Sequence, residues 1–139
     1  MTKARINDLI EVSPRFLRSA QLERDFLDPQ MLQGYIATPE VSRHLKRLGR
    51  GFAPDSGQRA WRITGDFGSG KSSFALLLAN LIGRPAAELP KEIRHLRNEL
   101  GLARNAPKLL PVLVTGSRES ISLAVLRSLG ETLARAVDG

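Results

Sequence analysis

Residues 65–72 read Gly65-Asp66-Phe67-Gly68-Ser69-Gly70-Lys71-Ser72 and match the pattern G-x-x-x-x-G-K-[ST] at every fixed position. Glycine lets the main chain turn so that successive N–H groups point at one anion. A helix that begins here aims its positive end at the same place. The pattern therefore predicts a binding site for the phosphate tail of a nucleotide. We expect its contacts to come from Gly65, Asp66, Phe67, Gly68, Ser69, Gly70, Lys71, Ser72 and Ser73.

Two residues of this stretch have specific expected roles. Lys71 is expected to place its ammonium group against the β- and γ-phosphates. The hydroxyl of Ser72 is expected to ligate the Mg²⁺ ion that bridges those phosphates. The cofactors that follow from the pattern are a nucleoside triphosphate and Mg²⁺.

The sequence on either side of the stretch predicts a strand before it and a buried helix after it. The segment 60–64 is short, rich in residues that favour strands, and bounded by turns. The segment 71–82 would be apolar on nearly every side of a helix. Gly83 and Pro85 are expected to end the helix. A strand, a glycine-rich turn and a helix in this order are the context that a phosphate-binding stretch of this pattern requires.

Three further elements are expected downstream. Residues 89–100 have the spacing of an amphipathic helix, residues 109–115 are a continuous apolar run typical of a buried parallel strand, and residues 119–137 predict a last helix. This order implies right-handed crossovers and an α/β fold with a parallel sheet flanked by helices. Residues 60–139 are thus expected to be a partial domain, with residues 1–59 as a helical or extended lead-in segment. The residues expected to be buried by the two helices are Leu89, Ile93, Leu96 and Leu100, and then Ile121, Ala124, Val125, Leu129 and Leu133.

The lead-in segment carries one clear helix signal. The alternation over residues 20–25 favours a short strand. Thr38 can cap a helix, Pro39 suits its first turn, and Glu40 complements its dipole. The helix that follows has an apolar stripe of Val41, Leu45, Leu48 and Phe52, and a basic side of Arg43, Lys46, Arg47 and Arg50.

A family resemblance rests on the segment from Trp61 to Leu78. It reads Trp61-Arg62-Ile63-Thr64-Gly65-Asp66-Phe67-Gly68-Ser69-Gly70-Lys71-Ser72-Ser73-Phe74-Ala75-Leu76-Leu77-Leu78 and resembles the Walker A segment of the P-loop NTPases, in particular of bacterial AAA-type ATPases. The resemblance covers about residues 60–82. It implies a partial P-loop NTPase (Rossmann-like) three-layer fold that binds Mg-ATP.

The resemblance also implies a wider role. The chain is also similar to the N-terminal part of large ATPases from phage-defence and other DNA-associated loci. This narrower resemblance includes the residues Gly34, Tyr35 and Ile36, which lie before the Walker A segment. In AAA-type proteins the segment before the first strand lines the adenine pocket, so Tyr35 and Ile36 are candidates for adenine contact. The resemblance implies that the chain is the N-terminal part of a larger, oligomeric ATPase that couples ATP hydrolysis to work on DNA or a protein.

The sequence departs from that family in one respect. A Walker B element needs an apolar strand that ends in Asp, and no Asp of this chain follows such a strand. No catalytic residue is therefore assigned, and ATPase activity would depend on an element farther downstream. Three alternatives stay open: a nucleotide-binding or interaction module without turnover, a nucleic-acid-binding protein, and a truncated product that does not fold.

Composition narrows the function classes further. The 139 residues include 21 Lys+Arg and 14 Asp+Glu, a net charge of +7, and no Cys. The lack of Cys excludes a disulfide scaffold, a thiolate zinc site and a Cys nucleophile, and the distance between His44 and His95 disfavours a histidine metal cluster. No apolar run is long enough to span a bilayer, and no secretory signal is present, so we expect a cytoplasmic protein without a membrane partner. The basic side of the 39–50 helix could contact nucleic-acid phosphates, but a solvated helix face is the favoured interpretation because no aromatic residues are interleaved with it.

Overall fold

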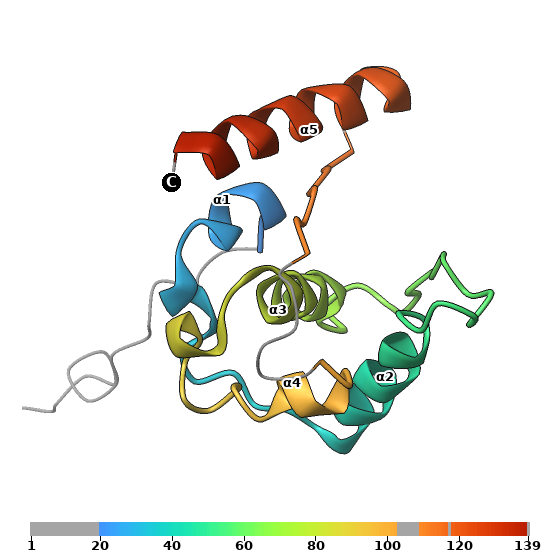
Figure 1. Ribbon diagram of the computed structural model, residues 1–139, viewed down its shortest axis with the longest axis vertical. Coiled ribbons are helices and arrows are strands. Elements are labelled where there is room, and N and C mark those ends of the chain that lie inside the picture. The colour runs from blue at the N-terminus through green and yellow to red at the C-terminus, as the bar shows by residue number, and fades with distance from the viewer. Residues whose placement is uncertain (1–19, 103–108, 117, 139) are drawn as a thin grey trace, which may run out of the picture.

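The computed structural model describes residues 20–102, 109–116 and 118–138. These residues form the α-helices α1 (Leu22–Phe26), α2 (Pro39–Arg50), α3 (Lys71–Gly83), α4 (Leu96–Glu99) and α5 (Ile121–Asp138), and the 3-10 helices η3 (Pro29–Leu32) and η4 (Ala86–Glu88). In Figure 1, α3 lies at the centre with α1 on one side and α4 on the other, while α5 lies beyond α1. Within these ranges no strand or sheet is formed.

The predicted α/β fold with a parallel sheet is therefore wrong, and with it the partial P-loop NTPase fold. A strand must pair its N–H and C=O groups with a neighbour. In the described part of the chain, no backbone hydrogen bond joins residues 60–64 to residues 109–115. The N–H of Leu109 instead donates to the carbonyl oxygen of Ile82 at 3.2 Å. An apolar, β-prone run forms a strand only where a partner strand is at hand, so composition alone misassigned both segments.

Residues 20–25 are also not a strand, because α1 begins at Leu22. The side chain of Gln21 accepts a hydrogen bond from the N–H of Arg24 at 2.8 Å and caps the helix. The carboxylate of the buried Asp25 accepts one in return from the N–H of Gln21 at 2.9 Å. These reciprocal bonds satisfy donors at the helix start and outweigh the weak alternation.

The helix start at Thr38 is confirmed by α2. The hydroxyl of Thr38 accepts a hydrogen bond from the N–H of Val41 at 3.4 Å, and Pro39 is in the first turn. Leu45 and Leu48 of the predicted apolar stripe are buried, whereas Phe52 lies beyond the helix end and is exposed.

The helix predicted at residue 71 is confirmed by α3, which begins at Lys71 and ends at Gly83. Its burial comes from helices and not from the predicted sheet, since α3 packs against α1 and α4. A Cβ added at Gly83 would lie 2.5 Å from Cγ of Pro111, so the downstream segment crosses the end of this helix closely. The core around α3 is made of Leu32, Leu45, Leu48, Phe74, Leu76, Leu77, Leu81, Leu89, Ile93, Leu96 and Leu100.

The segment 89–100 buries its predicted residues without forming the predicted helix. Leu89, Ile93, Leu96 and Leu100 are all at most 1% exposed. However, only Leu96–Glu99 is helical, and the preceding residues form successive turns with bonds to the third residue back, such as Leu96 N–H to Ile93 O at 3.0 Å. Turns of this kind keep an apolar residue on one side every three or four positions, so spacing alone does not distinguish them from a helix.

Arg97 of α4 satisfies the carboxyl end of α3. Its side chain is 5% exposed, and Nη1 donates to the carbonyl oxygens of Leu81 at 2.7 Å and Arg84 at 2.5 Å. The last carbonyl groups of a helix have no partner within the helix, and they carry its negative end. A buried guanidinium therefore replaces the water that would otherwise solvate them.

The last predicted helix is confirmed by α5, but of its five predicted buried residues only Ala124 is buried, and Leu129 is half-buried. Ala124, Ser128 and Thr132 are buried at intervals of four residues, whereas Ile121 is 80% exposed. Val125 and Leu133, which were also expected to be buried, are 43% and 47% exposed. The hydroxyl of Thr132 donates to the carbonyl oxygen of Ser128 at 2.7 Å, whereas the buried hydroxyl of Ser128 has no hydrogen-bond partner in the described part of the chain. None of the described helices is both long enough and apolar enough to cross a membrane.

Candidate functional site

The loop between residues 65 and 70 has a backbone that only glycine accommodates easily. Gly68 and Gly70 have φ values of 81° and 82°, in the left-handed region that L side chains rarely adopt. A Cβ added at Gly65 would lie 2.8 Å from Oγ of Ser69. The N–H of Ser69 donates to the carbonyl oxygen of Asp66 at 3.2 Å and closes a turn. Conformation therefore favours glycine at Gly70, a fixed position of the pattern, and at Gly68, a variable one, whereas a side chain at Gly65 would displace the hydroxyl of Ser69.

The ammonium group of Lys71 lies against this loop. Nζ donates to the carbonyl oxygens of Gly65 at 2.8 Å and Asp66 at 2.7 Å, and Oγ of Ser69 is 3.4 Å away. These partners are neutral, and Lys71 forms no ion pair with any carboxylate in the described ranges. The loop therefore positions a positive charge without neutralising it.

The same loop leads into the N-terminus of α3. Gly70 is the N-cap and supplies no side chain to bond the first N–H groups of the helix. Such N–H groups, together with the helix dipole, attract an anion. Ser72 and Ser73 are exposed in this first turn, so their hydroxyls are accessible from solvent. Donors and positive charge therefore converge where the pattern predicts a phosphate group.

A cavity of about 750 Å³ opens beside the start of α3. Its walls come from the segment between Tyr35 and Leu48, the segment from Gln58 to Gly65, and the first turn of α3. Of the residues predicted for the site, the structure brings together around this cavity Tyr35, Ile36, Gly65, Ser69, Gly70, Lys71 and Ser73. Ile36 is 84% exposed, while Tyr35 is half-buried and its burial raises the pKa of its phenol, which keeps it neutral.

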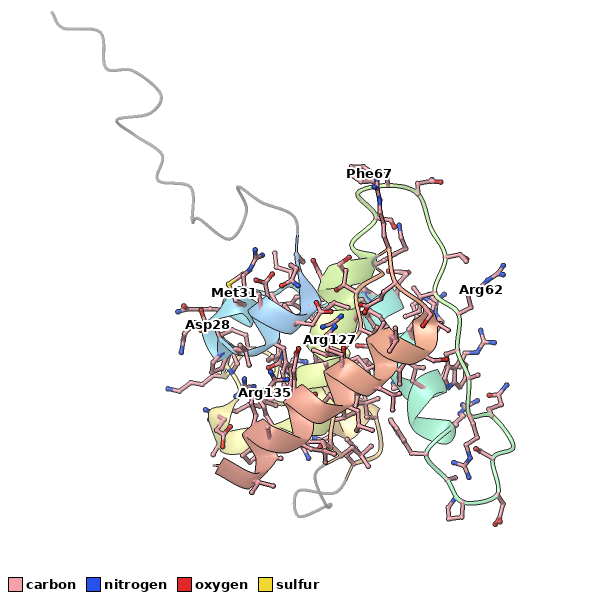
Figure 2. The ribbon with its side chains drawn as sticks, turned by 90° about the horizontal axis from the view of Figure 1, so that it is seen from above. Asp28, Met31, Arg62, Phe67, Arg127 and Arg135 are labelled. Carbon is pink, nitrogen blue, oxygen red and sulfur yellow. The ribbon has the colours of Figure 1, made fainter. Side chains whose placement is uncertain are left out.

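The remaining predicted residues lie outside the cavity wall. Asp66, Phe67, Gly68 and Ser72 do not line it. Figure 2 shows Phe67 at the outer end of the loop, away from the helices, and its side chain is fully exposed. Asp66 takes part through its backbone carbonyl, and Ser72 is exposed next to the wall.

Sequence reasoning did not assign the other wall residues to the site, and four of these form ring contacts. The guanidinium carbon of Arg47 lies 5.3 Å from the ring centroid of Trp61, and His44 meets the ring of Phe74 edge-on with centroids 6.1 Å apart. Arg47 and His44 are on α2, while Trp61 is in the segment that leads to the loop. Their proximity depends on how that segment folds back along α2, and no local pattern in the sequence carries this information.

The basic side of α2 is partly neutralised. Arg43 pairs with Glu40 at 3.1 Å, and Lys46 pairs with Glu99 of α4 at 3.1 Å. Exposed pairs of this kind are weak, but they lower the positive potential of that face. The preference for a solvated helix face over a nucleic-acid surface stays a prediction.

A metal ion at this site would depend on the nucleotide for most of its ligands. Among the residues that the structure describes, no group of three or more His, Cys, Asp or Glu side chains is placed to hold a metal. Mg²⁺ prefers oxygen ligands and usually keeps several waters, with substrate phosphates completing its shell. The exposed hydroxyl of Ser72 suits such a shell as one ligand.

No family model, curated protein or solved structure matches the chain. Together with the lack of strands among the described residues, this overturns the assignment to the P-loop NTPases and to the AAA-type ATPases. The case for function therefore rests on the geometry of the loop and its cavity. The division of the chain at residue 60 stays a prediction, and residues 1–19 of the lead-in segment lie outside the described residues.

Proposed function

We propose that residues 65–73 bind the phosphate tail of ATP together with Mg²⁺. One observation carries the proposal: the ammonium of Lys71 and the uncapped N-terminus of the thirteen-residue helix α3 converge at one cavity. Positive charge, free N–H donors and glycine-dependent turns are the features that favour a polyphosphate there. The proposal concerns this chemistry alone and does not depend on a parallel sheet.

In this proposal Lys71 supplies a positive charge for the phosphate, and the loop already holds its ammonium group in place. Its carbonyl partners fix Nζ near Gly65 and Asp66, so little side-chain freedom is left to lose when a phosphate arrives. An ammonium also has three donors, and a phosphate oxygen is a stronger acceptor than a neutral carbonyl because the bond is charge-assisted.

The Mg²⁺ ion supplies charge that offsets the phosphates when it is bound. Ser72 is the residue that would offer it a hydroxyl oxygen, with phosphate oxygens and water as the remaining ligands. Binding is the activity proposed, because no carboxylate in the described part of the chain lines the cavity apart from Glu40 on α2. A cytoplasmic location goes with this proposal, and work on DNA or a protein stays an expectation from the sequence.

Calorimetry with Mg-ATP tests the proposal. The variant Lys71→Ala should bind roughly tenfold to a hundredfold more weakly than the parent chain, because a hydrogen bond to a charged group contributes about 1.5–3 kcal/mol. Lys91→Ala is the matched control, since Lys91 is exposed and does not line the cavity. Thermal unfolding of both variants checks that they fold. Equal affinity in the parent chain and Lys71→Ala, with both folded, would contradict the proposal.

A further inference from the structure

We infer that the same cavity holds the nucleobase against Trp61 and Arg47, and that stacking there selects nucleotides over free polyphosphates with little preference among purines. This rests on the proposed binding of the phosphate tail and adds a second subsite to it. The juxtaposition that carries it is the guanidinium of Arg47 over the ring of Trp61 in the wall of the cavity.

The cavity has room for more than a phosphate tail. Its volume of about 750 Å³ lies well inside the range of roughly 300–1,000 Å³ that is typical of pockets for whole small-molecule ligands. The phosphate tail would occupy only the end next to Lys71 and Gly70. The rest of the cavity extends to α2, where Val41 and Leu48 contribute apolar surface. A ligand that fills both ends needs an anionic tail and a flat, largely apolar body.

Arg47 and Trp61 give part of the cavity wall flat groups that suit a base. Trp61 is half-buried, and its Nε1 would lie 3.1 Å from a Cβ added at Gly51, so the indole packs closely against the turn after α2. A ring held in this way loses little freedom when a ligand stacks on it. The guanidinium of Arg47 is a second planar group, and both indole rings and guanidinium planes are surfaces on which bases stack. This part of the cavity wall therefore suits the flat, aromatic ring of a nucleobase.

A subsite of this kind distinguishes poorly between bases. Stacking on an aromatic ring is tolerant of base identity because every base has a π-face. Arg47 also has no carboxylate partner in the described ranges, so it does not need to leave an ion pair to contact a ligand. We therefore expect the presence of a base to matter more than which purine it is.

Trp61 is the sole tryptophan of the chain, so its fluorescence reports this subsite directly. The full chain is titrated with Mg-ATP, Mg-GTP and Mg-tripolyphosphate. ATP and GTP should both quench the emission of Trp61 and bind roughly tenfold more tightly than tripolyphosphate, with affinities close to each other. Equal affinity of ATP and tripolyphosphate would overturn the subsite and leave the phosphate site intact. Binding of none of the three would overturn the phosphate site as well.

Variants assign the effect to the wall. Trp61→Leu should reduce the preference for ATP over tripolyphosphate to near unity, measured by calorimetry, while Trp61→Phe should keep most of it because a ring remains. Phe52→Leu is the matched control, because Phe52 is an exposed aromatic residue that does not line the cavity, and this variant should keep the preference. Retention of the preference in a folded Trp61→Leu would overturn the assignment to Trp61.

Discussion

Gly49 of α2 lies directly against the backbone of Leu100, at the end of α4. A Cβ added at Gly49 would be 2.3 Å from the carbonyl oxygen of Leu100 and 2.9 Å from its Cα. Real Cβ atoms do not approach backbone so closely. The lack of a side chain at this one position therefore sets how closely α2 and α4 pack, and α2 in turn carries one wall of the cavity.

Gly49→Ala is expected to destabilise the fold. The added methyl group forces α2 away from Leu100, and overpacking of this kind costs roughly 1–3 kcal/mol. Chemical denaturation measures the free energy of unfolding. The control is Gly130→Ala in α5, where an added Cβ meets nothing within 4 Å, so alanine should stabilise by up to about 1 kcal/mol. Similar effects from the two substitutions would show that α2 and α4 do not pack as described.

Arg97→Met should destabilise the chain by about 2 kcal/mol, because the carbonyl groups of Leu81 and Arg84 lose a buried charged donor. Methionine keeps much of the length and apolar volume of the side chain, so the loss reports the hydrogen bonds. Arg62→Ala is the comparison, since Arg62 points outward and is exposed, and it should change stability by less than about 0.5 kcal/mol. If Arg97→Met left the free energy of unfolding unchanged, the carbonyl groups at the end of α3 would have to be solvated in another way.

The contact between Glu23 and Thr115 should make stability depend on acid pH. Partial burial raises the pKa of Glu23, but hydrogen bonds from Thr115 and from the backbone N–H of Glu23, together with the charge of Arg127, outweigh it and leave the pKa below its ordinary value of 4.5. A carboxyl group whose pKa is lowered by folding stabilises the protein above the unfolded pKa, and that stabilisation is lost as the pH falls through the folded pKa. The Glu23 contribution should therefore be complete above about pH 5 and decline below pH 4.5.

Denaturation curves between pH 3 and pH 6 check this expectation for Glu23→Gln beside the parent chain. The difference in unfolding free energy between the two should shrink as the pH falls, since the protonated Glu23 resembles glutamine. A difference that stays constant over this range would show that Glu23 does not titrate as a partner of Thr115.

Gly70→Ala should weaken binding of Mg-ATP, because a residue with a side chain resists the left-handed conformation and the first N–H groups of α3 would turn away from the phosphate. The variant Gly57→Ala is the control that separates a loss of affinity caused by general backbone strain from one caused by the loop itself. Gly57 has a φ of 63°, and an added Cβ there meets nothing within 4 Å, so alanine introduces comparable strain outside the cavity wall. Both variants should lose roughly 1–2 kcal/mol of stability. Only Gly70→Ala should lose affinity, and an equal loss in Gly57→Ala would argue against a specific role for the loop.

Local signals in the sequence predicted helices well and their partners poorly. The cap at Thr38 and the apolar run after Lys71 depend on neighbouring residues, and α2 and α3 begin where those signals place them. The run at 109–115 needed a partner strand that the described part of the chain does not supply. A hydrophobic pattern indicates that a segment will be buried, but it does not indicate which other segment it will pack against.

The candidate site divides in the same way. The turns at Gly68 and Gly70 and the position of Lys71 follow from the spacing of a short stretch, which the sequence displays in full. The part of the wall around Trp61 depends on its contact with Arg47, and the two residues are separated by a loop whose path no local rule defines. Sequence reasoning favoured a solvated face for the basic side of α2 because no aromatic residues are interleaved with it, and the ring that Arg47 contacts comes from another segment.

Residue-level NMR of the full chain during titration with Mg-ATP tests the central claim most directly. The account predicts that the largest amide shifts occur at Gly68, Gly70, Lys71, Ser72 and Ser73, and that Mg-tripolyphosphate shifts the same amides. Shifts confined to the arginine-rich face of α2, with the amides of residues 68–73 unchanged at saturation, would contradict it.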